Sequence, residues 1–311
     1  MKLGPLPISL RQLQYAVAID EVKSFRRAAE LCRVSQPSLS SQLAELESAL
    51  GVRLFERDRR RVLPTGPGKE LLDRARRVLL EAEDLALAAR RLGDPLAGTL
   101  RVGVIPTISP YLLPDVVPAL RASLPSLEVI WIEDKTEVLV RRLGAGELDA
   151  ALLALEAPIG QVDSEVVVKD PFVLAAPPGH PLLRRRSPAK LAELRGTKVL
   201  LLDDGHCLRD QALSICSAAE AQELGFRATS LSTLTQMVAG GAGITLLPRL
   251  AVRTETRRAD LVVRPFAQPA PHRTVALVWR PRSPLGPPLR QVASILRKAC
   301  GGVHSSRRRD R

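Results

Sequence analysis

The sequence predicts an α/β protein that has an N-terminal winged helix-turn-helix with a long linker helix, followed by a two-lobed α/β domain. Three observations support this prediction. Two short helical patterns and a third with a small, polar leading edge fill residues 10–50, and an arginine-rich hairpin pattern follows them. A heptad repeat of apolar residues begins after residue 67. Beyond residue 99, segments with strand and helix patterns alternate.

The length and charge of the chain limit its class. Its 311 residues are enough for two or three domains, each with its own core. No apolar stretch is long enough to span a bilayer, and no apolar run precedes a cleavage site at the N-terminus, so we expect a cytoplasmic protein with no membrane partner. The net charge of +13, densest toward the two ends, indicates a polyanionic partner. The basic segment after residue 300 is expected to be a disordered tail.

The first predicted element is a helix-turn-helix. Leu10–Val22 has apolar residues at helical spacing, Ser24 can cap a second helix, and Ser35 can cap a third. The leading residues of the third helix are small or polar, which suits contact with base edges in the major groove of DNA. The candidate DNA-binding residues on this helix are Ser35, Gln36, Pro37, Ser38, Ser40 and Ser41. The alternative is an arbitrary three-helix bundle.

An arginine-rich hairpin is expected next. The segment VRLFERDRRRVLPT has the pattern of two short strands around Asp58–Arg61. Arg53 and Arg57 are candidates for contacts with phosphates or a narrow minor groove. The alternative is that these arginines only line a solvated face.

A long helix is predicted to begin at Pro67. Apolar residues recur along it at alternating spacings of four and three, which is the pattern of a coiled-coil seam. These residues are Leu71, Ala75, Val78, Ala82, Leu85, Ala89 and Leu92. We expect the helix to pair with a second copy of the chain and to end in a hinge at Gly93–Gly98. The alternative is an amphipathic helix packed on its own domain.

The alternating segments that follow predict a doubly wound parallel sheet divided into two lobes. Ligands in such sheets bind at the carboxyl ends of the strands, often between lobes. The sequence contains no Walker A, dinucleotide-binding, nucleophile-elbow or zinc-protease motif. We therefore expect no metal and no cofactor.

The cysteines do not form the pattern of a disulfide framework or a zinc site. The chain has four, Cys32, Cys207, Cys216 and Cys300, and no two of them make a C-x-x-C pair. Cys32 and Cys300 are expected to be inert buried side chains. The other two lie nine positions apart in LDDGHCLRDQALSIC, a segment expected to be helical.

Together these features resemble the LysR-type transcriptional regulators. The resemblance is carried by FRRAAELCRVSQPSLSSQLAELESALGVRLFERDRRRVLPTGPG and GAGITLLP, and it covers nearly the whole chain. Within the family, IPTISPYLLP, DGHCLRDQAL with a second cysteine, and FRATSL are similar to the hydrogen-peroxide-sensing branch. The resemblance implies a periplasmic-binding-protein-like effector domain. It also implies a nucleoid-associated homodimer or homotetramer that binds double-stranded promoter DNA and contacts RNA polymerase.

The domains expected from the patterns and the resemblance are a winged helix-turn-helix (1–66), a dimerising linker helix and hinge (67–98), a two-lobed redox-sensing domain (99–300) and a basic tail (301–311).

The resemblance also implies roles for four residues of the regulatory domain. Cys207 resembles the cysteine that peroxide oxidises, and Cys216 resembles the cysteine that then pairs with it. Thr107 and Thr136 match positions whose hydroxyls line the peroxide pocket, and a hydroxyl can both donate to and accept from H–O–O–H. The alternatives are that Cys216 never pairs and that the threonines are ordinary strand-edge or capping residues.

Three neighbours are expected to act on the Cys207 thiol, whose reactive form is the thiolate. Arg209, His206 and a helix N-terminus close to the thiol would each favour the anion. Asp210 is expected to orient neighbouring groups. The alternative for His206 is that it only caps the helix.

A helix between the two cysteines would prevent a disulfide. Nine residues at a rise of ~1.5 Å per residue separate the Cα atoms of Cys207 and Cys216 by roughly 13 Å, whereas a disulfide needs Cα atoms within about 7 Å. Pairing would therefore require the helix to unwind, and that change can repack a subunit contact.

Three functions are compatible with these features. The first is a peroxide-sensing regulator in which Cys207 is oxidised to a sulfenic acid and then pairs with Cys216. The second is a LysR-type regulator that binds a small organic effector between the lobes, with incidental cysteines. The third is a thiol peroxidase, but the chain lacks a thioredoxin pattern and carries a DNA-binding head, so we expect no enzyme.

Overall fold

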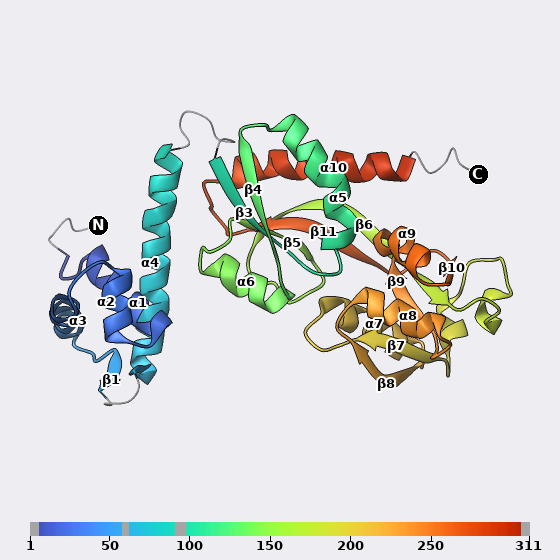
Figure 1. The fold of residues 1–311 in the computed structure, drawn as a ribbon, viewed down its shortest axis with the longest axis horizontal. Helices are drawn as coiled ribbons and strands as arrows, with labels where there is room; N and C mark the ends of the chain where they lie inside the picture. Colours follow the sequence, from blue (N-terminus) through green and yellow to red (C-terminus); the bar gives the residue numbers. More distant parts are fainter. Residues whose placement is uncertain (1–5, 58–61, 91–97, 306–311) are drawn as a thin grey trace. The chain divides into compact units, whose positions relative to one another are not determined.

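The computed structural model describes residues 6–57, 62–90 and 98–305, which divide into two compact units, Met1–Arg90 and Arg91–Arg311 (Figure 1). The hairpin tip at residues 58–61, most of the expected hinge with Leu92, and residues 306–311 of the expected tail lie outside the described residues.

The first unit begins with three short helices around one core. They are α1 (Leu10–Val22), α2 (Phe25–Leu31) and α3 (Gln36–Leu50). The hydroxyls of Ser9, Ser24 and Ser35 cap them by accepting from the backbone N–H three residues later. Gly51 ends α3 at a φ of 66°, a conformation that favours glycine. These local signals explain why the helix boundaries follow the sequence pattern so closely.

A hairpin and a long helix complete the first unit. The hairpin pairs β1 (Phe55–Arg57) with β2 (Val62–Pro64) in antiparallel register, and α4 (Gly66–Arg90) follows directly. Arg76 of α4 forms an ion pair with Asp20 of α1, which ties the long helix to the head. The winged helix-turn-helix predicted from the sequence is therefore present.

The predicted seam along α4 divides into two parts. Its first residues pack on the unit's own core, where Ala75 is buried and Leu71 is partly buried. Further along, Val78 is 46% exposed and Leu85 is 74% exposed. Only the later part of the seam is thus available to a second chain, because the head covers the earlier part.

The second unit is built on a mixed sheet of seven strands (Figure 1). Its strands are β3 (Gly98–Val104), β4 (Leu127–Glu133), β5 (Ala150–Ala154), β6 (Asp163–Ala176), β9 (Thr245–Pro248), β10 (Val262–Pro265) and β11 (His272–Trp279). The order is β10-β6-β11-β5-β3-β4, and β9 pairs with β6. A smaller sheet pairs β7 (Lys198–Leu202) with β8 (Gln222–Ala228) in parallel.

The expectation of a parallel sheet is wrong, because the second unit contains both parallel and antiparallel strand pairs. β3 pairs in parallel with β4 and β5, but β11 pairs antiparallel with β5 and β6, and β6 pairs antiparallel with β9 and β10. The reason is the path of the chain between the lobes. The first part of β6 pairs with β11 and its last part with β9 and β10, so β6 leads into the second lobe and β11 leads back.

Helices cover both lobes of the second unit. They are α5 (Ser109–Ser123), α6 (Thr136–Gly144), α7 (Cys207–Ala218), α8 (Leu231–Ala239), α9 (Arg249–Arg258) and α10 (Gly286–Ser305), with 3₁₀ turns η1 (Pro181–Leu183) and η2 (Leu191–Leu194). α10 reaches into the segment expected to be a disordered tail. One face of this helix, which includes Leu289, Leu296 and Cys300, is buried, and the helix packs along α5 and β6.

A buried carboxylate joins three of these helices. Glu255 of α9 is fully buried and accepts hydrogen bonds from the hydroxyls of Tyr111 in α5 at 2.7 Å and Thr235 in α8 at 3.0 Å. Ser232 donates a third at 3.2 Å. Since every one of these donors is a neutral hydroxyl with a specific position, the network fixes how α5, α8 and α9 pack.

We expect Gly68→Ala to destabilise the first unit by about 1–3 kcal/mol, the usual cost of overpacking. A Cβ at Gly68 would lie 2.1 Å from the backbone oxygen of Leu54, which cannot move without shifting the segment that leads into β1. Hydrogen exchange of the α4 and β2 amides, followed by mass spectrometry, measures the loss. Gly66→Ala in the same helix is the control, because its Cβ would meet nothing within 4 Å. Equal protection in the two variants would contradict the prediction.

Candidate functional site

The cysteine that the sequence singles out lies where three helices begin. Cys207 is the first residue of α7 and is 7% exposed. A small pocket beside it is lined by residues just before or at the starts of α5, α6 and α7. These residues are Ile105, Pro106, Thr107, Lys135, Thr136, Gly205, His206 and Cys207. The pocket is small, with about 160 Å³ of empty space that includes open solvent, and a water molecule does not fit between its side chains in this structure.

None of these three helices has a side-chain cap at its N-terminus. The first backbone N–H groups of a helix have no partner within the helix, and together they carry a partial positive charge. The N-terminus of α7 favours a negatively charged group at this pocket, and the backbone N–H of Leu208 favours the thiolate of Cys207. The expected helix N-terminus at Cys207 is therefore present.

Opposing effects act on the acidity of Cys207. Burial raises the pKa of its thiol above the ordinary value, while the Thr136 hydroxyl and the positive charge of Arg273 lower it, and Asp210 raises it. The Thr136 hydroxyl interacts with the thiol without reaching regular hydrogen-bond geometry, so its Oγ1 is buried with no regular partner among the described residues. Such a hydroxyl is available to a small polar ligand.

Arg273 is the residue of this site that sequence reasoning missed. It is fully buried in β11, and its Nε donates to Oδ2 of Asp170 at 3.0 Å. Its Nη1 donates to the Thr107 hydroxyl at 2.8 Å and its Nη2 to the Thr107 carbonyl at 2.9 Å. Since Thr107 Oγ1 accepts from arginine, its own O–H is available for another acceptor. The signal that could have found Arg273 is a charged residue inside the apolar strand pattern HRTVALVW.

Arg209 does not act on Cys207 as the sequence suggested. Its Nε donates to Asp204 at 2.9 Å and its Nη1 to Glu223 of β8 at 2.7 Å, so its side chain is turned toward the smaller sheet. His206 does not supply the charge either, because burial and the nearby Lys135 lower its pKa and favour the neutral imidazole. The positive charge that lowers the pKa of Cys207 is that of Arg273, which lies far from it in the sequence.

A second, larger cavity of about 540 Å³ lies on another side of Cys207. Cys207, Gln211, Ser214 and Ile215 line it from one face of α7, as helical spacing requires. Both amide atoms of Gln211 are buried and have no partner in the part of the chain that the structure describes. Asp210, expected to orient its neighbours, is exposed and contributes to the same cavity.

Cys216 lies on the opposite side of α7. Nine residues at about 100° each leave two side chains half a turn apart. Cys216 accordingly belongs to the hydrophobic core of the second lobe, whereas Cys207 does not. Both are free thiols, and burial raises the pKa of Cys216 to about 11. Both cysteines lie in the one helix α7, so their Cα atoms are ~13 Å apart at the standard helical rise.

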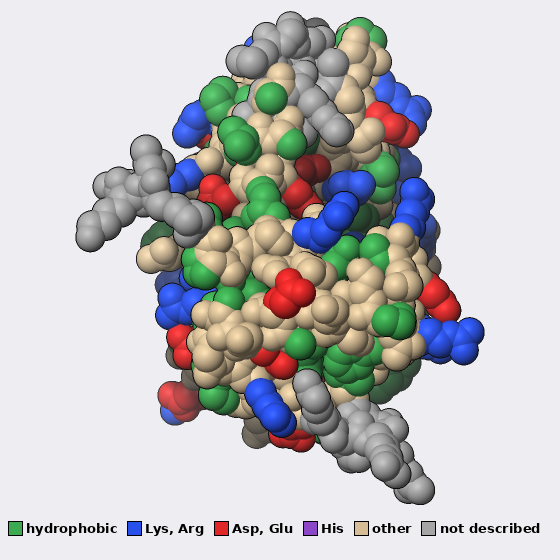
Figure 2. Space-filling view, turned by 90° about the vertical axis from the view of Figure 1, so that its left-hand side faces the viewer, with side chains coloured by type: hydrophobic (Ala, Val, Ile, Leu, Met, Phe, Trp, Pro, Cys, Tyr) green, Lys and Arg blue, Asp and Glu red, His purple; other side chains and the backbone are tan. Residues whose placement is uncertain are grey.

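The candidate DNA-binding residues lie at one end of α3. Ser35, Gln36, Pro37, Ser38 and Ser41 are exposed, while Ser40 is half-buried. Leu39, Leu43 and Leu46 face the core and hold the helix in place. Arg53 is exposed before β1, and Arg57 is the last residue of that strand. Figure 2 shows one face of the molecule, on which Lys and Arg side chains are scattered among hydrophobic and uncharged ones.

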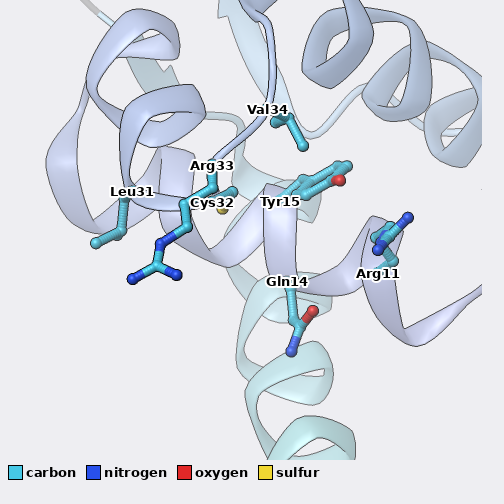
Figure 3. Close-up of a pocket in the computed structure, with 7 residues that line it drawn as sticks. All are labelled: Arg11, Gln14, Tyr15, Leu31, Cys32, Arg33 and Val34. Atoms are coloured by element: carbon cyan, nitrogen blue, oxygen red, sulfur yellow. The ribbon is translucent and has the colours of Figure 1, made fainter.

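The first unit has a cavity of its own, of about 530 Å³ (Figure 3). Arg11, Gln14 and Tyr15 of α1 line it on one side, and Cys32 and Arg33 of the turn before α3 on the other. Cys32 is partly buried, and burial raises its pKa. The charge of Glu21 raises this pKa as well, and both effects disfavour the reactive thiolate.

The described residues contain no group of three or more His, Cys, Asp or Glu side chains placed to hold a metal ion. Within the same residues, every helix is too short or too polar to cross a membrane.

Comparison with known proteins gives one consistent result. Residues 10–69 match the family described as bacterial regulatory helix-turn-helix protein, lysR family, and residues 93–301 match the LysR substrate binding domain. The DNA-binding transcriptional dual regulator OxyR of Escherichia coli K12 is 45% identical over 296 residues, which cover 95% of this chain and 97% of that protein.

Two solved structures extend the comparison. A full-length OxyR variant from Pseudomonas aeruginosa is 35% identical with a TM-score of 0.75, and the match covers 93% of this chain and 95% of that one. A hydrogen-peroxide-bound OxyR mutant from Corynebacterium glutamicum is 36% identical with a TM-score of 0.64, and the match covers 94% of each chain.

We expect Thr136→Val to raise the pKa of Cys207, because the hydroxyl that favours its thiolate is lost. Less thiolate is then present at neutral pH, and iodoacetamide labels Cys207 more slowly, with the pH profile of labelling moved to higher pH. The free energy of unfolding should change by less than about 1 kcal/mol, because the removed hydroxyl makes no regular hydrogen bond. Thr136→Ser keeps the hydroxyl and is the control. Identical labelling profiles for the valine variant and the wild type would show that Thr136 does not act on the thiol.

Proposed function

The chain belongs to the LysR family of bacterial transcriptional regulators, and from this membership and the surroundings of Cys207 we propose that it is a DNA-binding regulator that senses hydrogen peroxide. The observation that carries the proposal is a buried cysteine at the uncapped N-terminus of α7, next to two threonine hydroxyls and a buried arginine. The names of the relatives, OxyR and hydrogen peroxide-inducible genes activator, support it.

The proposed chemistry begins with the Cys207 thiolate. The sulfur attacks one peroxide oxygen, an S–O bond forms, the O–O bond breaks, and the departing hydroxide takes a proton to become water. Thr107 and Thr136 hold the peroxide through their O–H groups, and Arg273 stabilises the charge that moves from sulfur to oxygen. Because a water molecule does not fit between the side chains of this pocket, they must move to admit peroxide.

The second proposed step forms the disulfide. The Cys216 thiol attacks the sulfur of the Cys207 sulfenic acid, an S–S bond forms and the oxygen leaves as water. The two residues lie on opposite faces of one helix, so α7 must unwind and Cys216 must leave the core of the second lobe. Arg209 connects α7 to Glu223 of β8, so unwinding also changes the contacts of the smaller sheet.

The DNA-binding part of the proposal rests on the first unit. The exposed residues at the start of α3 would read bases in the major groove, and Arg53 and Arg57 would bind phosphates at the hairpin. The exposed Val78 and Leu85 of α4 would pair with a second chain. We further propose that dimers associate as tetramers and that the DNA-bound protein contacts RNA polymerase. We also propose that the winged helix-turn-helix ends at residue 66, the linker helix and hinge at residue 98, and the regulatory domain at residue 300.

A second candidate function is favoured by the larger cavity beside Cys207. Its volume of about 540 Å³ and the unpartnered Gln211 amide suit a small organic effector. Such a regulator would respond without oxidation of either cysteine. We do not propose that the protein is an enzyme. In the proposed mechanism, oxidation of Cys207 is followed by a conformational change of α7 and not by rapid return of the reduced thiol.

We expect Cys207→Ser to abolish the peroxide response. The serine oxygen is not oxidised by micromolar peroxide, so the promoter footprint of the variant should stay that of the reduced wild type. The footprint is measured before and after peroxide, with Cys300→Ser as a control that should respond normally. A footprint that still changes in the Cys207 variant would exclude the peroxide mechanism and favour the organic effector.

We expect Cys216→Ser to retain oxidation but not the full response. Cys207 would still form a sulfenic acid, but no second thiol would trap it, so the footprint change should be slow or partial. Mass spectrometry of peroxide-treated wild type should find a peptide that links residues 207 and 216. If no such peptide forms while Cys207 still responds, the two-thiol mechanism is wrong and Cys207 acts alone.

A further inference from the structure

Three consecutive arginines, Arg184, Arg185 and Arg186, lie on a surface loop of the second unit between η1 and η2. Residues 184–188 are all exposed, and they consist only of arginine, serine and proline. No ion pair or hydrogen bond of the described residues involves any of the three guanidinium groups. Glu193 interacts electrostatically with Arg185, but both of its carboxylate oxygens bond to Arg264. The loop therefore presents three positive charges, none of which has a hydrogen-bonded acid among the described residues.

A buried arginine holds the backbone of this loop at both ends. Arg264 of β10 is 4% exposed, its Nε donates to the carbonyl of Ser187 at 2.6 Å, and its Nη1 donates to the carbonyl of Leu182 at 2.6 Å. Glu193 balances the charge of Arg264 at 3.0 Å. Next to the loop, the N–H of Ala189 donates to the carbonyl of Pro265 at 2.8 Å. These contacts keep the arginines on an ordered loop, which lowers the entropic cost of binding.

The chemistry of the loop indicates the kind of partner. The centres of protein–protein interfaces are depleted of charge and enriched in aromatic side chains, and residues 184–188 offer neither an aromatic nor an exposed aliphatic side chain. Guanidinium groups match phosphate oxygens in geometry and charge. A row of them without hydrogen-bonded acids therefore fits a phosphate backbone better than a protein surface.

We propose that the loop containing Arg184, Arg185 and Arg186 binds the phosphates of promoter DNA outside the base pairs that α3 reads. This inference rests on the proposed function, because it needs a DNA-bound regulator. It adds a contact between the regulatory unit and DNA that does not depend on base sequence. Its effect is on affinity and salt dependence, and the choice of operator stays with the helix-turn-helix.

The test compares full-length wild type with Arg184→Ser/Arg185→Ser/Arg186→Ser. Binding to an operator duplex with long flanks is measured by fluorescence anisotropy from 50 to 200 mM salt. Each phosphate contact contributes about 0.9 to the slope of log affinity against log salt, so losing three contacts makes the slope ~2.7 shallower. Over this fourfold change in salt, the wild type should then lose about 40-fold more affinity than the variant. On a short duplex that contains only the operator half-sites, wild type and variant should have the same slope.

Two further variants complete the test. Arg184→Lys/Arg185→Lys/Arg186→Lys keeps the charge and should keep most of the slope. Arg121→Ser/Arg253→Ser/Arg257→Ser removes three exposed charges elsewhere on the second unit and should leave the slope within ~0.5 of wild type. Thermal unfolding of each variant confirms that it is folded.

An equal slope in the loop variant and this control would overturn the inference, since the arginines would then be only solvated. An unchanged slope combined with weaker transcription by RNA polymerase would also overturn it, by assigning the loop to a protein partner. Neither result would contradict the proposed function. That function would be contradicted if the wild type gave no specific, peroxide-dependent footprint.

Discussion

The regulatory unit depends on one buried cluster, in which the guanidinium of Arg273 holds Asp170 and Thr107. A buried charge without a partner costs several kcal/mol. Here Arg273 donates to Asp170 and to the Thr107 carbonyl, and the carboxylate of Asp170 also accepts a hydrogen bond from the N–H of Leu250. The cluster joins β11, β6, the segment before α5 and the start of α9. It also places a positive charge near Cys207. The same contacts therefore support both the packing of the lobes and the chemistry of the thiol.

The surroundings of Cys207 balance protection against reactivity. Burial alone would keep the thiol protonated and inert, because it raises the pKa. The Thr136 hydroxyl, Arg273 and the backbone N–H of Leu208 at the start of α7 oppose that effect at the small pocket beside the sulfur. Cys207 is 7% exposed, so the chemistry of this site depends on its buried neighbours rather than on an exposed thiol.

Helix α7 makes the oxidised and reduced states incompatible with one another. A helix places Cys207 and Cys216 on opposite faces, and the core of the second lobe holds Cys216 in position. Arg209 of the same helix donates a hydrogen bond to Glu223 in β8. A disulfide can form only if these contacts are lost, so the energy of the new bond is coupled to a rearrangement of α7, the lobe core and the smaller sheet. In the proposed mechanism, this rearrangement changes how subunits associate on DNA.

Local sequence is sufficient to predict the helices of the head, because a capping hydroxyl at Ser35 and a glycine at residue 51 act through hydrogen bonds a few residues long. The same kind of signal predicts a helix that starts at Cys207, and the family resemblance selects Thr107 and Thr136. Local sequence does not predict that Arg273 contacts Thr107, since 166 positions separate them, nor that Arg209 turns toward Glu223. Strand direction was mispredicted for a related reason. Contacts and directions of this kind depend on which segments pack together after the chain has crossed between lobes twice, and no pattern within a single segment contains that information.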